Sequence, residues 1–210
     1  MSVIKFSELQ QDAIVELVNL GIGKAAKALS DIIREEVILS VPEIKFVNYD
    51  DLLQHMKDID GDTPAAVTQS FSGDFSGKAM LLFPEQSGIS LVKQMLRGSV
   101  TDDNIASLEE EALMEIGNII LNACFGQIGN LLSTDLDGSL PHYLKSSVEV
   151  ILNEVEGESA TLHESQTLLL QVDFSLHESK TKGFVIFAMD VSSLSIFKQK
   201  IDQYLQKIFR

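Results

Sequence analysis

The sequence lacks the residues that mark several classes of protein. Cys124 is the only cysteine, so no disulfide can form within the chain. The four histidines (His55, His142, His163 and His177) are scattered and give no zinc-type ligand spacing. No apolar run approaches the roughly 18–20 residues of a membrane span. The first residues lack the basic segment and long apolar core of a secretory signal, so we expect a cytoplasmic protein with no metal site of its own.

Basic residues are also scarce. Sixteen Lys and Arg stand against 31 Asp and Glu, which gives a formal net charge of −15. Nucleic acids and anionic membranes are bound by clusters of Lys and Arg, so we expect neither as a partner. The apolar content of 45% is ordinary for a globular protein with a buried core. A chain of 210 residues can form one large domain or two small halves.

The sequence does contain one polar motif that occurs twice. In each copy an acid, a Glu and an Asn stand at i, i+4 and i+7, which is one stripe on one face of a helix. The copies are Asp12, Glu16 and Asn19, then Glu111, Glu115 and Asn118. Twenty-two residues separate each Asn from a proline, Pro42 or Pro141, so that Glu, Asn and Pro all repeat at an offset of 99 residues. This repeat favours an internal duplication over chance.

Two long helices are predicted to carry the two copies, over residues 7–34 and 107–133. Each begins with a capping box, a Ser followed three residues later by Gln or Glu, and each continues with an apolar period typical of a helix. Gly21 and Gly23 follow the first Asn closely. They indicate a bend or a close approach by another backbone.

The other predicted elements are strands and shorter helices. Strands are expected at 36–49, 65–73, 75–83, 146–154, 166–176 and 183–190, and helices at 85–97 and 191–210. A polar loop with a short helical piece is expected at 50–63. Its segment 58–62 resembles a calcium loop only weakly, because the glycine comes fourth and Gln69 stands where the loop needs Glu, so no calcium site is expected.

The order helix, strand, strand, strand, helix therefore occurs twice. Residues 77–83 also match 183–189 at an offset of 106. We predict an α/β (α+β) fold in which two pseudo-two-fold repeats, about 7–98 and 107–210, share one mixed or antiparallel sheet. The long motif helices would pack on that sheet, and residues 1–210 would form a single domain.

The motif pair resembles the signature of the CheC/CheX/FliY phosphatases of chemotaxis. That signature is an Asp or Ser, three residues, Glu, two residues, Asn, twenty-two residues and Pro. The first copy fits it fully, whereas the second has Glu111 at the place of the Asp or Ser. The resemblance covers nearly the whole chain and is closest to CheC, because two motifs lie in one polypeptide and the length leaves no room for the further domain of FliY.

The resemblance implies a phosphatase of a phosphorylated, CheY-like response regulator. Asn19 or Asn118 would place the water that attacks the aspartyl phosphate, and Glu16 or Glu115 would pair with the regulator's lysine. Asp12 and Glu111 would assist docking, whereas Pro42 and Pro141 would shape the fold. The regulator would bring the Mg²⁺. The chemistry suits a carboxamide, because phosphoryl transfer depends on positioning and a carboxamide can both accept from and donate to water.

Two alternatives remain open at this point. The protein can be a weakly catalytic or non-catalytic partner of the receptor deamidase CheD, which CheC proteins of this family bind. It can also act on a response regulator outside chemotaxis. Cys124 lies in an apolar helical run and is interpreted as a buried small side chain rather than a nucleophile.

Overall fold

The computed structural model describes residues 4–57, 63–95, 102–156, 166–176 and 179–209. The helices are α1 (Glu8–Ile33), α2 (Tyr49–Lys57), α3 (Glu85–Met95), α4 (Asp102–Leu132), α5 (Val148–Glu156) and α6 (Val191–Ile208). The strands are β1 (Val37–Val47), β2 (Ala65–Gly73), β3 (Gly77–Phe83), β4 (Leu136–Gly138), β5 (His142–Lys145), β6 (Gln166–Leu176) and β7 (Ser179–Met189). Within these ranges no helix is long and apolar enough to cross a membrane.

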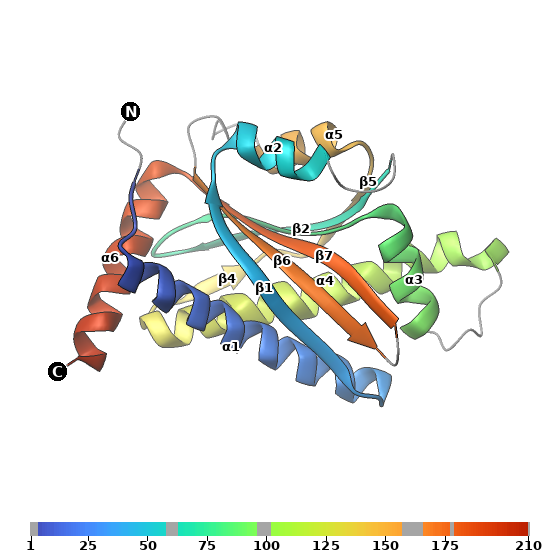
Figure 1. Cartoon of the computed structure of the whole chain (residues 1–210), viewed down its shortest axis with the longest axis horizontal. Coiled ribbons are helices and arrows are strands. Elements are labelled where there is room, and N and C mark those ends of the chain that lie inside the picture. The colour runs from blue at the N-terminus through green and yellow to red at the C-terminus, as the bar shows by residue number, and fades with distance from the viewer. Residues whose placement is uncertain (1–3, 58–62, 96–101, 157–165, 177–178, 210) are drawn as a thin grey trace.

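The strands form one antiparallel sheet between two layers of helices. Its order is β1-β6-β7-β3-β2-β4, and β5 also pairs with β2, at residues 65–68, whereas β4 pairs at residues 71–73. Helices α1 and α4 run side by side along one face, and α2 and α5 cover the other (Figure 1). The predicted α/β fold with a shared sheet and packed motif helices is confirmed, and the paired strands are all antiparallel rather than mixed.

The two faces of the sheet follow from the alternation of side chains along each strand. In β3, Ala79, Leu81 and Phe83 belong to the core beneath α1 and α4. Met80 and Leu82 belong to the smaller core beneath α2 and α5. Successive side chains of a strand point to opposite faces, so a strand buried on both sides must be apolar at nearly every position.

The first helix begins as the sequence predicts. The Ser7 hydroxyl accepts from the Gln10 backbone N–H at 3.3 Å, and the Gln10 side-chain oxygen accepts from the Ser7 N–H at 2.8 Å. Both halves of the capping box are therefore present. The Gln10 amide also donates to Asp202 of α6 at 2.6 Å, which ties the start of α1 to the last helix.

Ser7→Ala is expected to lower the free energy of unfolding by about 1 kcal/mol, the usual cost of losing a helix N-cap side chain. Chemical denaturation followed by circular dichroism measures this. The exposed Ser195→Ala in α6 is the control and is expected to change stability by less than about 0.5 kcal/mol, as surface substitutions usually do. Equal effects at both positions would contradict the capping assignment.

Several relations support the predicted internal duplication. Each edge of the sheet begins with the strand that follows a motif helix: β1 follows α1 at one edge, and β4 follows α4 at the other. The strands β3 and β7 lie at the centre. There Met80 lies opposite Ile186, and these residues are also 106 apart in the sequence. Helices α1 and α4 end at left-handed residues 99 positions apart, Arg34 (φ 59°) and Ser133 (φ 52°). A two-fold axis through the Met80–Ile186 pair accounts for all three.

Two sequence predictions are wrong. The strand expected at 146–154 is instead helix α5, preceded by the short strands β4 and β5. The apolar residues Val148, Ile151 and Leu152 have helical spacing, and the last two are fully buried against the smaller core. The helix start expected at Ser107 is also wrong, because α4 begins five residues earlier, at Asp102. The segment at 58–62 lies outside the described residues.

Candidate functional site

The first motif lies on the solvent side of α1. Asp12, Glu16 and Asn19 are all exposed, whereas Ile14 and Leu17 on the opposite side of the helix are buried. Helix α1 is continuous through Gly21 and Gly23, so the i, i+4 and i+7 positions stay in one stripe. Gly21 marks a close approach, as predicted, because a Cβ there would lie 3.0 Å from Cα of Cys124 in α4.

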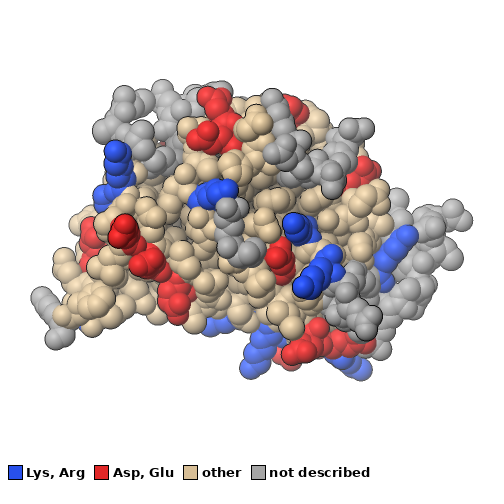
Figure 2. Space-filling model, viewed as in Figure 1, with Lys and Arg blue, Asp and Glu red and all other residues tan. Residues whose placement is uncertain are grey.

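Acidic and apolar side chains surround this first stripe. A row of acidic side chains follows the N-terminal half of α1 at the lower left of Figure 2, where the exposed acids are Glu8, Asp12 and Glu16. Leu9 and Leu20 flank the row and are 48% and 41% exposed. The surface thus offers carboxylates and two apolar side chains in one place, a composition suited to docking a protein that presents a cation.

The second motif lies on α4 and differs from the first at its Asn. Glu111 and Glu115 are exposed, whereas Asn118 is half-buried. Its side-chain oxygen Oδ1 accepts from Gln69 Nε2 at 3.2 Å and from Asn122 Nδ2 at 2.6 Å. Asn122 Nδ2 lies 2.9 Å from the Asn118 backbone oxygen as well. Two hydrogen bonds therefore fix the Asn118 side chain. Within the described residues, the Asn19 side chain makes no such hydrogen bond.

Asn118 is more buried than Asn19 because of the residue that precedes each of them in its helix. Gly117 precedes Asn118, and a Cβ at Gly117 would lie only 2.5 Å from Cγ1 of Val67 in β2. The absence of a side chain lets α4 lie directly on β2, which brings Asn118 within reach of Gln69. At the corresponding place in α1 stands Val18, which is buried and fills that space.

The two motif prolines both lie where an edge strand is interrupted. Pro42 lies in β1, the edge strand, at the register shift between Ser40 and Glu43. Pro141 lies between β4 and β5, which together occupy the opposite edge of the sheet. Proline lacks the N–H that a strand interior requires, so each interrupts pairing. The structural role of both residues stays a prediction.

Gln69 and Asn122 both contact Asn118, and the motif spacing does not include either of them. Gln69 lies in β2 with 2% of its surface exposed. A polar residue at an apolar position of a strand was the signal that could have identified it. Asn122 stands at i+4 from Asn118 and could have been found by the same helix spacing that defined the motif.

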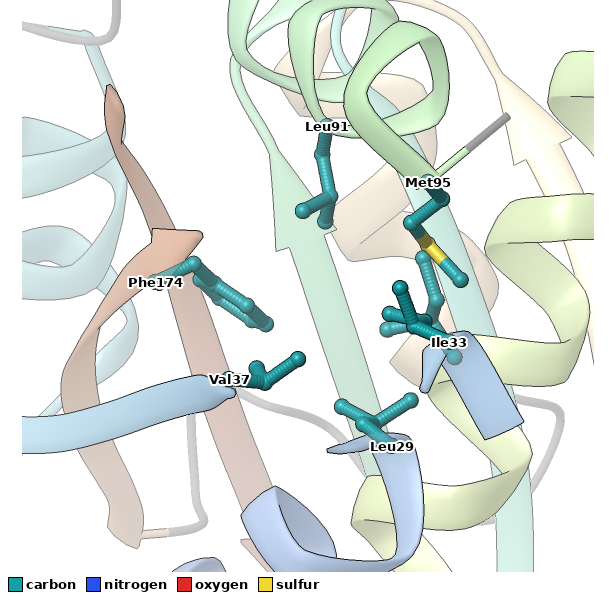
Figure 3. A pocket seen from close by; sticks show the side chains of 7 residues that line it. Leu29, Ile33, Val37, Leu91, Met95 and Phe174 are labelled. Carbon is teal, nitrogen blue, oxygen red and sulfur yellow. The ribbon is translucent and has the colours of Figure 1, made fainter. Parts of the chain in front are cut away.

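Two pockets among the described residues are not lined by the motif residues. A pocket between α1, α3, α4 and β6 is lined only by apolar side chains (Figure 3). These are Leu29, Ile33, Val37, Leu91, Met95, Ile116 and Phe174. Such a lining offers nothing to bind a phosphate. The carboxylates of both motifs lie exposed on the helix surfaces instead.

In the described part of the chain, neither a metal-binding cluster nor a readily ionised thiol accompanies the motif. There, no group of three His, Cys, Asp or Glu side chains could hold a metal ion. Cys124 is fully buried between α1 and α4, and this burial raises the pKa of its thiol to about 12. A thiol so far from ionisation is a poor nucleophile, as the sequence interpretation expected.

A sheet with two long helices on one face (Figure 1), each with an acid–Glu–Asn stripe, is the architecture with which known proteins can be compared. The chain is 23% identical over 195 residues to "CheY-P phosphatase CheC" of Bacillus subtilis (strain 168), covering 89% of this chain and 90% of that protein. It is 23% identical over 173 residues to "Flagellar motor switch phosphatase FliY" of the same organism, covering 81% of this chain and 43% of that protein. No family model matches the sequence.

The fold has the same relatives. The structure of Thermotoga maritima FliY superposes with a TM-score of 0.73 at 14% identity, covering 97% of this chain and 99% of that one. CheX in the CheX–CheY–BeF3–Mg²⁺ complex of Borrelia burgdorferi superposes with a TM-score of 0.54 at 16% identity, covering 84% and 99%. The chain is therefore similar in sequence to CheC and FliY, and similar in fold to FliY and CheX.

Proposed function

We propose that this protein is a phosphatase of an aspartyl-phosphorylated, CheY-like response regulator, with one site on α1 and one on α4. The exposed pair Glu16 and Asn19 on one helix face is the observation that carries this proposal. Support comes from the names of the relatives, two of which are phosphatases, and from a related CheX seen in complex with CheY.

The chemistry needs little from the protein beyond placement. An aspartyl phosphate is an acyl phosphate, and its hydrolysis requires a water in line with the phosphorus. The Asn19 oxygen would accept a hydrogen bond from that water and its NH₂ group would donate one, so the carboxamide fixes the water's orientation. Glu16, one helical turn away, would pair with the regulator's lysine and hold the two proteins in register.

The metal in this reaction would belong to the substrate. Mg²⁺ bound in the regulator's own acidic pocket would stabilise the phosphoryl oxygens. The exposed acids of α1 do not provide long-range attraction to an acidic regulator, so the docking would depend on close contacts. Glu16 and the flanking Leu9 and Leu20 supply those contacts at the first site.

A catalytic amount of the protein is expected to accelerate the loss of phosphate from a phosphorylated CheY-like regulator at least about 100-fold, the lower end of what a positioned catalytic group contributes. Released phosphate, measured after removal of the phosphodonor, should exceed the protein added. Serum albumin at equal mass is the control. Unchanged decay together with tight binding to a CheD deamidase would contradict the phosphatase and favour the binding-module alternative.

The choice of regulator is tested in the same assay. A panel of phosphorylated regulators, from chemotaxis and from other two-component pathways, replaces the single substrate. We propose a chemotaxis regulator, so the CheY-like member should give the highest kcat/KM. A higher value for another regulator would reassign the substrate while leaving the chemistry in place.

A further inference from the structure

The side chain of Asn118 has two polar neighbours that Asn19 lacks. Gln69 Nε2 and Asn122 Nδ2 both donate to its oxygen Oδ1, at 3.2 Å and 2.6 Å. A carboxamide oxygen has two lone pairs, so these two donors occupy its acceptor capacity. The oxygen that would accept a hydrogen bond from the attacking water is thereby engaged within the protein, and only the NH₂ group is left to face outward.

The internal duplication shows what stands at the same places in the first half. Gln69 pairs with Ala79 and Leu170 pairs with Val185. Ala79 and Val185 are 106 residues apart, so Leu170 is the counterpart of Gln69.

The counterpart of the second donor follows from the other offset. Asn122 corresponds to Gly23 at the 99-residue offset of the motif helices. Gly23 is exposed, and a Cβ there would have no neighbour within 4 Å. Both hydrogen-bond donors therefore occur only in the second site. Gln69 stands where the first half of the duplication has Leu170, and Asn122 stands where it has Gly23.

Packing alone does not account for Gln69. It is 2% exposed and its Nε2 donates to the Ser139 backbone oxygen at 2.8 Å as well as to Asn118. Its own oxygen Oε1 is buried without a hydrogen-bond partner. Such an unpartnered group costs stability, and the fully buried Leu170 shows that an apolar side chain fits the corresponding place.

We propose that Gln69 and Asn122 are positioning residues of the second site, which hold the Asn118 oxygen away from the attacking water and so make this site slower than the first. The proposal rests on the proposed phosphatase function. Glu115 stays exposed, so docking of the regulator at α4 is retained while turnover is reduced. The two sites of one chain thus differ in rate because of two side chains and not because of the motif itself.

The first test isolates the second site in an Asn19→Ala background. Adding Asn122→Ala, Gln69→Leu, or both, is expected to raise kcat about three- to tenfold, the factor that corresponds to one ordinary hydrogen bond. KM for the regulator should stay unchanged. Asn122 is exposed, so its variant keeps the test valid if Gln69→Leu folds poorly. A fall in kcat would overturn the proposal, because it would mean that the two donors hold Asn118 in its active orientation.

The second test builds the same contact at the first site in an Asn118→Ala background. Gly23→Asn places a carboxamide at i+4 from Asn19, as Asn122 is from Asn118, and is expected to lower kcat about threefold or more, the loss corresponding to one ordinary hydrogen bond. Gly23→Ala, which adds no donor, is the matched control and should leave kcat unchanged. Equal rates for the two Gly23 variants would contradict the proposal.

These outcomes are separable from failure of the proposed function. If the unmodified protein does not accelerate phosphate loss from the regulator, the phosphatase function fails and the positioning role fails with it. If the protein is active but neither set of variants changes kcat, only the positioning role is overturned.

Discussion

The Asn19→Ala/Asn118→Ala double variant is expected to reduce acceleration of regulator dephosphorylation by about 100-fold or more, which leaves decay near its spontaneous rate. This is the size of loss seen when a preorganised polar group is removed from a transition state. Both Asn side chains would be the groups that orient water, so no remaining residue of either stripe can replace them. Phosphate release under multiple turnover, with the regulator in excess, measures the effect.

The two single variants are expected to differ. Asn19→Ala should lose at least as much activity as Asn118→Ala, because Asn19 is exposed while the Asn118 oxygen already accepts from Gln69 and Asn122. Asn130→Ala serves as the matched control, since Asn130 is an exposed Asn of α4 outside the stripe. Activity that survives loss of Asn19 but not of Asn118 would contradict this ranking.

Much of the architecture was predictable from repetition in the sequence. The 99-residue offset located both motif helices and both prolines, and the 106-residue offset located the two central strands. These features were readable because a helix period and a strand period are local properties of the chain. The solvent exposure of Glu16 and Asn19 followed from the same helix period.

The wrong strand prediction concerns a segment whose local sequence pattern fits both a strand and a helix. The run around Ile151 and Leu152 is rich in β-branched and aliphatic residues, and burial against the second core decides that it is helical. The unequal depth of Asn19 and Asn118 was likewise not readable from the motif. It depends on a contact between Gly117 and Val67, fifty residues apart in the chain.

That contact leads to the second prediction, which concerns stability. Gly117→Ala is expected to destabilise the protein by about 3 kcal/mol, at the upper end of overpacking costs. The added Cβ would lie 2.5 Å from Cγ1 and 2.7 Å from Cβ of Val67. Val is β-branched and stiff, and Val67 is fully buried in β2 and paired on both sides, with β3 and β5, so it cannot move aside without shifting β2 or α4.

Gly126→Ala is the matched control on the same helix. Gly126 is exposed and a Cβ there would have no neighbour within 4 Å, so the same substitution should stabilise the helix by up to about 1 kcal/mol. Denaturant unfolding of both variants measures the two effects, and opposite signs are expected. If Gly117→Ala is also neutral or stabilising, then α4 does not lie as close to β2 as the contact requires, and Asn118 would not be drawn toward Gln69.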